Sequence, residues 1–163
     1  MAAGKGSLLP TLVNSYAGAL LSVSQTVGIQ VQFLKTQVTP GVNAPGGRAA
    51  ALIGIVGPGV HSTASVIADM VAFDTFVSAF TGGMIKANVD DPMSMSVLGE
   101  LTNMVSGQAL IKASVPGLDI TPPQLLSGEN IKTIPSKKAG VSSFTLPFKV
   151  GEGNLYLILS VHE

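Results

Sequence analysis

An internal repeat constrains the fold of this chain more than any other feature of its sequence. Shifted by 89 residues, an early helix-forming stretch matches a later one at three polar positions: Ser7 with Ser96, Thr11 with Glu100, and Asn14 with Asn103. The following turns and strands also match: GIQV (28–31) with GLDI (117–120) and, at a shift of 94 residues, VGPG (56–59) with VGEG (150–153). Short turns coincide by chance in a chain with 19 glycines, but the shared order of elements favours a repeat.

Each half of the repeat predicts a helix, a strand and a two-strand hairpin. We expect helices over 7–27, over 70–80, and from the Asp91-Pro92 helix start to about residue 113. The expected strands are 28–34, the hairpin 49–68, and the stretches 118–126, 143–150 and 155–161. The prediction is one α+β domain over 1–163, with halves at about 7–68 and 92–161 linked by a helix at about 69–82. Its antiparallel-rich sheet has about six strands, with about three helices.

Composition narrows the classes of partner. Of the 163 residues, 46% are hydrophobic and 11% charged, and the net charge is zero without a basic run. Nucleic acid and acidic membrane surfaces are therefore unfavourable partners. The apolar N-terminal stretch is interrupted by Pro10 and Asn14, which favours a helix of the mature protein over a signal peptide. We expect no membrane insertion, and the absence of cysteine fits a cytoplasmic protein.

The helix over 96–111 has two contrasting faces. At 100° per residue the predicted core face comprises Val97, Leu98, Leu101, Met104, Val105 and Ile111. The opposite face comprises Ser96, Gly99, Glu100, Asn103 and Gly107, with Leu110 as an exception. A partner could thus approach the backbone closely and meet one acid and one amide, which are neighbours three residues apart.

Two other interpretations of this face remain open. An ordinary solvated face carries lysine, glutamate, glutamine and arginine, whereas two glycines cost about 1 kcal/mol each in helix propensity. Alternatively, the glycines could permit close packing inside the protein, which would bury Glu100 without a partner unless a cation reached it. The residues favour an exposed working surface.

The chemistry of this pair suits positioning. An amide cannot act as a base near neutral pH, but Asn103 can hold a water molecule by donating and accepting hydrogen bonds. Glu100 could pair with a lysine of a partner and fix the docking register. One carboxylate without histidine or a second acid provides too few ligands for a metal site.

At these residues the chain resembles the CheC/CheX/FliY family of bacterial phosphatases, and most closely its CheX members. The family pattern is Asp or Ser, three residues, Glu, two residues, Asn, and a proline some twenty residues later. Ser96, Glu100 and Asn103 match in register, and Pro122 and Pro123 stand slightly short of the usual distance. The resemblance covers the chain from about residue 7 to its end and implies a CheC-like fold.

The resemblance implies that the protein hydrolyses the aspartyl phosphate of a CheY-type response regulator. Asn103 would orient the attacking water, Glu100 would pair with the regulator's active-site lysine, and Ser96, Gly99 and Gly107 would shape the partner-binding face. No cofactor of its own is implied, because Mg²⁺ would belong to the regulator. The alternative is a signalling or scaffold module of the same fold that docks on a regulator without catalysis.

The resemblance also bears on the first half of the repeat and on assembly. Ser7, Thr11 and Asn14 would form a degenerate second site, because Thr11 stands where the family has glutamate. The resemblance implies a homodimer, in which sheet edges of the two subunits would join. The sequence itself hints at such an edge only in the apolar strand Leu155–Leu159.

Overall fold

A computed structural model describes residues 8–131 and 141–162, so that Ser7 lies outside the described residues. The helices are α1 (Leu8–Thr26), α2 (Met70–Thr81) and α3 (Pro92–Ala113), with a short 3₁₀-helix, η2 (Lys35–Gln37). The strands are β1 (Val31–Phe33), β2 (Thr39–Pro40), β3 (Ala49–Gly57), β4 (Val60–Ala68), β5 (Asp119–Ile120), β6 (Gln124–Ser127), β7 (Val141–Val150) and β8 (Gly153–His162). The predicted α+β class is confirmed.

The sheet has eight described strands, slightly more than the six expected. The stretch expected as one strand over 118–126 forms two short strands, β5 and β6, because the prolines at 122 and 123 lack the N–H groups that a continuous ladder needs. A further short strand, β2, begins the proline- and glycine-rich stretch 39–48, where no strand was expected. The other long elements begin and end within a few residues of the predicted limits.

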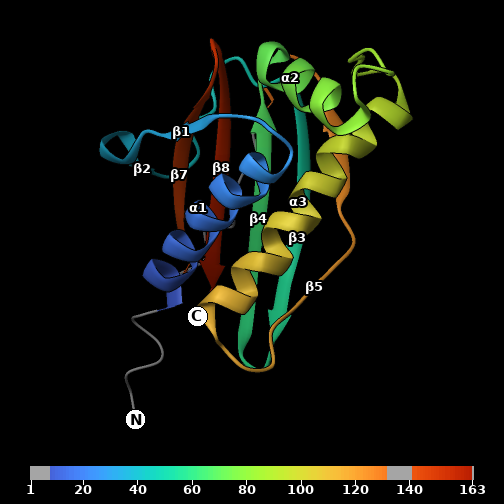
Figure 1. Ribbon diagram of the computed structural model, residues 1–163. Coiled ribbons are helices and arrows are strands. Elements are labelled where there is room, and N and C mark those ends of the chain that lie inside the picture. Colours follow the sequence, from blue (N-terminus) through green and yellow to red (C-terminus); the bar gives the residue numbers. More distant parts are fainter. Residues whose placement is uncertain (1–7, 132–140, 163) are drawn as a thin grey trace.

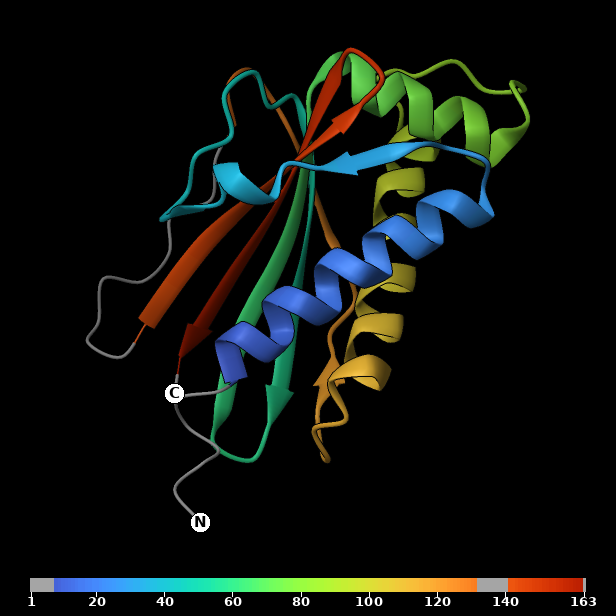
Figure 2. The same ribbon diagram turned by 60° about the vertical axis from the view of Figure 1, so that its left-hand side comes forward.

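The two long helices cover one face of the sheet (Figures 1 and 2). The described strands pair antiparallel in the order β1-β7-β8-β4-β3-β5, with β2 also on β7 and β6 also on β3. The main core lies between α1, α3 and the sheet, and includes the fully buried side chains of Leu12, Tyr16, Leu98, Leu101 and Phe148. A smaller cluster around Ile67 and Tyr156 lies on the opposite face.

The pairing pattern relates the two halves by an approximate twofold axis. The central strands β4 and β8 pair with each other, while β1 pairs with β7 of the other half and β5 pairs with β3. The helices α1 and α3 run in opposite directions along the sheet (Figure 1). Positions that match by the shift of 89 residues therefore lie toward opposite ends of the helix pair.

The structure corrects the predicted alignment of the two hairpins. In β3–β4 the ladder closes at Gly57 opposite Val60, and in β7–β8 it closes at Val150 opposite Gly153. The two-residue turns are therefore 58–59 and 151–152, which correspond by a shift of 93 residues, not 94. This difference of one residue is important, because a strand displaced by one residue turns its side chains to the opposite face of the sheet.

The apolar strand Leu155–Leu159 is not a sheet edge, contrary to the hint in the sequence. It belongs to β8, which is paired along its length with β4 on one side and β7 on the other. Its continuous apolar run reflects burial on both faces.

Candidate active site

The candidate site lies on α3, whose two ends are fixed by local interactions. The Asp91 carboxylate accepts a 3.1 Å hydrogen bond from the N–H of Met93, and Pro92 begins the helix. At the other end Ser114 adopts a left-handed conformation, and its N–H is bonded to the last turn. The cap predicted from Asp91 and Pro92 is therefore present.

The inner face of α3 anchors the helix to α1 and the sheet. Val97, Leu98, Leu101 and Val105 are buried, as the wheel predicted. The hydroxyl of Tyr16 on α1 donates a 2.8 Å hydrogen bond to Oγ of Ser106, and the Thr102 hydroxyl donates to the carbonyl of Leu98. The polar groups of the inner face are thus satisfied inside the protein, which holds the outer face at a fixed orientation.

Glu100 and Asn103 project from the outer face of this anchored helix. Glu100 is exposed and Asn103 is half-buried. Within residues 8–131 and 141–162, neither side chain has a hydrogen-bond or ion-pair partner. The acid and the amide are therefore both available to another molecule. Ser96, also exposed, instead donates a 2.7 Å hydrogen bond to the carbonyl of Met93.

Gly99 does not lie on the open face, and that expectation is wrong. It is buried, and a Cβ placed on it would lie 3.1 Å from Cδ2 of Leu125 and 3.4 Å from Cγ of Pro123. The absence of a side chain thus lets β6 and the preceding proline pack closely against α3, one turn from Asn103. Close internal packing, one of the alternatives left open, is correct for this glycine, without burying Glu100.

Gly107 behaves differently from Gly99. It is half-buried, and a Cβ placed on it would meet no protein atom within 4 Å. The space above Gly107 is therefore open in the direction that a side chain would occupy. The wheel is also wrong for Ile111, which is 78% exposed, because Leu110 and Ala113 pack against the core in the last turn of α3 instead.

The equivalent face of α1 retains part of the pattern. Asn14 is exposed, Thr11 is half-buried, and Gly18, which the repeat matches to Gly107, also has open space where a Cβ would be. The sequence alignment of the two halves did not include Gly18, although Gly18 and Gly107 are also 89 residues apart. Since Thr11 replaces the glutamate, α1 lacks the carboxylate of the α3 face.

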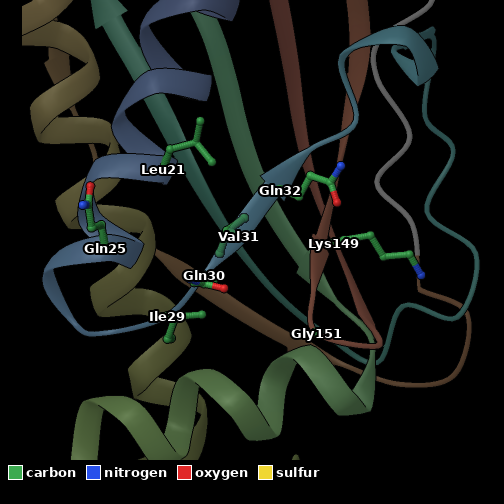
Figure 3. A pocket seen from close by; sticks show the side chains of 8 residues that line it. All are labelled: Leu21, Gln25, Ile29, Gln30, Val31, Gln32, Lys149 and Gly151. Carbon is green, nitrogen blue, oxygen red and sulfur yellow. The ribbon is translucent and has the colours of Figure 1, made fainter.

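Figure 3 shows a hollow among the described residues. Its volume is about 700 Å³, and it is bordered by the end of α1, β1 and the β7–β8 turn. Its polar lining consists of Gln25, Gln30, Gln32 and Lys149, and no residue of α3 borders it. Glu100 and Asn103 therefore lie outside this hollow.

Two further features of the described residues bear on the chemistry. Residues 8–131 and 141–162 contain no cluster of three or more histidine, cysteine or acidic side chains that could hold a metal ion. In the same residues, no helix combines the length and hydropathy needed to cross a membrane.

Solved structures define the class of this fold. A CheC-like superfamily protein from Shewanella sp. PV-4 superposes with a TM-score of 0.74 at 24% identity, covering 94% of this chain and 98% of the other. The chemotaxis protein CheX from Vibrio vulnificus superposes with a TM-score of 0.73 at 23% identity, covering 93% and 99%. In a CheX–CheY–BeF₃–Mg²⁺ complex from Borrelia burgdorferi, the matching chain gives a TM-score of 0.68 at 17% identity, covering 95% and 97%. The architecture is that of a CheC-like protein.

Sequence comparison gives the family. Residues 49–149, more than half of the chain, match the family model of the chemotaxis phosphatase CheX, and the protein therefore belongs to the CheX family. The CheY-P phosphatase CheX of Thermotoga maritima is 40% identical over 81 residues. That match spans about half the length of either chain, 48% in each case. The family resemblance seen in the sequence is thus confirmed.

Proposed function

We propose that this protein is a phosphatase that accelerates hydrolysis of the aspartyl phosphate of a CheY-type response regulator. Membership of the CheX family and the similarity to the Thermotoga maritima CheY-P phosphatase support this activity. The Borrelia burgdorferi complex, which pairs a protein of the same fold with CheY, supports the kind of partner.

The observation that carries the proposal is the state of Glu100 and Asn103. Both side chains lack a partner among the described residues, although they are one helical turn apart on a helix that is capped and anchored. A rigid element that presents two unpaired polar groups in a fixed relation is suited to completing another protein's active site.

In this proposal Asn103 orients the attacking water. Hydrolysis of an acyl phosphate requires a water oxygen in line with the bond between phosphorus and the aspartate oxygen. The carboxamide can accept a hydrogen bond from that water and donate one to a neighbouring oxygen, so it restricts the position of the nucleophile. The gain comes from positioning rather than from proton abstraction, because a neutral amide is not a base.

Glu100 would fix the register of docking. It is the only charged side chain on α3 before Lys112, so its charge is not neutralised from its own helix. A lysine of the regulator could pair with it, and the pair would strengthen as water leaves the interface. This pairing would bring the amide of Asn103 to the phosphoryl group.

The metal ion of the reaction would reside on the regulator. The Borrelia burgdorferi complex contains Mg²⁺ and BeF₃ together with CheY. The described part of this chain supplies no cluster of metal ligands of its own. The chemistry assigned to Asn103 and Glu100 requires none, since the regulator would supply both the metal and the electrophile.

The remaining expectations belong to the same proposal. One site would be active, on α3, while Thr11 and Asn14 on α1, together with Ser7, would form the degenerate copy. The protein would act as a homodimer in the cytoplasm. Sedimentation velocity of the purified chain tests this oligomeric state, and the proposal predicts a particle with twice the mass of the monomer.

Decay of a radiolabelled phosphoryl-regulator, measured with and without the protein, tests the activity. The proposal predicts accelerated decay at sub-stoichiometric protein. A non-catalytic docking module of the same fold would instead bind the regulator and leave the decay rate unchanged. Measuring binding and decay on the same samples separates the two functions.

A further inference from the structure

We propose that Leu125 on β6 and Met93 in the first turn of α3 form an apolar docking rim on either side of the Glu100–Asn103 pair. This inference rests on the proposed function, because it names the surface that binds the same regulator. The rim would set affinity for the regulator, while Asn103 serves the chemistry.

Leu125 occupies the space that Gly99 leaves beside Asn103. Its Cδ2 atom would be 3.1 Å from a Cβ at Gly99, and residues 99 and 103 are neighbours on the helix surface. Leu125 is nevertheless 39% exposed. A separate strand therefore supplies an apolar side chain at Gly99, where the helix has none.

The sheet register fixes the direction of Leu125. It pairs with Ala51, which belongs to the core beneath the helices, whereas the next residue, Leu126, pairs with Ala50 of the cluster on the opposite face. Successive side chains of a strand alternate between faces. Leu125 thus lies on the side of α3, and Leu126, which is 46% exposed, lies on the other side of the sheet.

Met93 extends the same helix face at its N-terminal end. It precedes Ser96 by three residues and Glu100 by seven, the spacing that places residues in one stripe. Its side chain is 64% exposed, although a methionine gains by burial. Met93 and Leu125 therefore flank the acid and the amide from two different elements.

The regulator is the occupant that this arrangement fits. Leu125 covers Gly99, one helical turn from Asn103, so a partner that docks on the amide would also meet the exposed part of the Leu125 side chain. Apolar side chains around a central polar pair exclude water on docking, which strengthens an interaction between Glu100 and a cation of the partner. The rim is continuous with the proposed site and needs no second partner.

Titration of the regulator loaded with BeF₃ and Mg²⁺ tests the rim independently of catalysis. We expect Met93→Ser and Leu125→Ser each to weaken binding about tenfold, and Leu126→Ser to leave it within twofold. Leu125→Met should restore binding, which separates a lost apolar contact from a disturbed strand. Circular dichroism of each variant verifies the fold.

The outcomes separate this inference from the proposed function. Unchanged affinity in both Met93→Ser and Leu125→Ser, or an equal loss in Leu126→Ser, overturns the rim even if the wild-type protein is an active phosphatase. Selective loss of binding in a protein that never accelerates decay supports the rim and rejects the phosphatase. No binding by the wild-type protein to any regulator of the host rejects both.

Discussion

The hydroxyl of Tyr16 donates a 2.8 Å hydrogen bond to Oγ of Ser106, and this bond joins α1 to α3 inside the core. Both residues are buried. The bond lies behind the outer face of α3, between the helix that presents the site and its counterpart from the other half. It therefore contributes both to stability and to the fixed orientation of the site.

Stability should fall at alkaline pH because of Tyr16. Burial raises the pKa of this phenol from 10.0 to about 12, although the hydrogen bond with Ser106 opposes part of the shift. The phenol of Tyr16 then loses its proton at a lower pH in the unfolded chain than in the folded chain. The contribution of Tyr16 to the unfolding free energy is therefore intact below pH 10 and is lost as the pH rises toward 12. The difference between the pKa values of Tyr16 in the folded and unfolded chain corresponds to about 2–3 kcal/mol of unfolding free energy.

Urea unfolding between pH 8.5 and pH 11.5 measures this dependence. In Tyr16→Phe the loss over this window should shrink. It should not vanish, because burial and the charge of Asp69 also raise the pKa of Tyr156, the only other tyrosine. An undiminished pH dependence in Tyr16→Phe would show that Tyr16 ionises freely in the folded protein.

Asn103→Ala should remove most of the phosphatase activity. Loss of the group that positions the water is expected to reduce kcat by about a hundredfold or more, while regulator binding changes little. The matched control is Asn14→Ala, which removes an exposed amide from the equivalent position of α1. Single-turnover decay of the phosphoryl-regulator measures both, and equal losses in the two variants would contradict a single active face.

Glu100→Ala should weaken both binding and catalysis. Removing the carboxylate eliminates the proposed ion pair with the regulator, so KM rises and kcat falls. Because the pair is electrostatic, Glu100→Gln should behave like Glu100→Ala, and the wild-type affinity should decrease with salt more steeply than that of either variant. Steady-state decay at 50 mM and 300 mM salt provides the comparison; salt slopes identical to wild type would exclude the ion pair.

Gly107→Ala should separate stability from function. No atom lies within 4 Å of the added Cβ, so the helix should gain about 0.5–1 kcal/mol in unfolding free energy. If the regulator packs over this backbone, the methyl group should also weaken binding. Gly18→Ala on α1, which has the same open space, should stabilise equally without affecting the regulator. Thermal unfolding of both variants measures the gain in stability, and titration with the regulator measures the change in binding. Unchanged binding in Gly107→Ala would exclude Gly107 from the docking face.

Asp69→Ala should be among the more destabilising substitutions outside the apolar core. Its carboxylate accepts hydrogen bonds from the N–H of Ala72 at the start of α2 and from the N–H and side-chain amide of Asn154, at 2.9, 2.8 and 3.0 Å. We expect a loss of about 2–4 kcal/mol. The comparison is Asp91→Ala, where one exposed cap bond of 3.1 Å should contribute only about 1 kcal/mol. Equal losses of unfolding free energy in Asp69→Ala and Asp91→Ala, measured with urea, would contradict a stabilising role for the hydrogen bonds between Asp69 and Asn154.

Local sequence signals predicted the elements that carry the site. The Asp91-Pro92 helix start, the turn around Pro58 and the apolar spacing of α1 each act within a few residues, so their structures follow from neighbouring side chains. The CheC-like class followed from the Glu100–Asn103 pattern inside a repeated order of elements.

Long-range contacts explain what the sequence could not reveal. Gly99 is buried because β6, some 25 residues later, pairs with β3 and brings Leu125 against α3. A helical wheel treats each helix alone, and it therefore assigned Gly99 to the open face and Ile111 to the core. The central position of β8 likewise depends on pairing with β4, which lies in the other half of the chain.

The most direct test of the central claim is decay of a phosphoryl-regulator in the presence of this protein and of Asn103→Ala. The proposal predicts that the wild-type protein shortens the lifetime of the aspartyl phosphate of a cognate regulator at sub-stoichiometric amounts, and that Asn103→Ala binds without doing so. An unchanged lifetime across the regulators of the host, or full activity in Asn103→Ala, would contradict it.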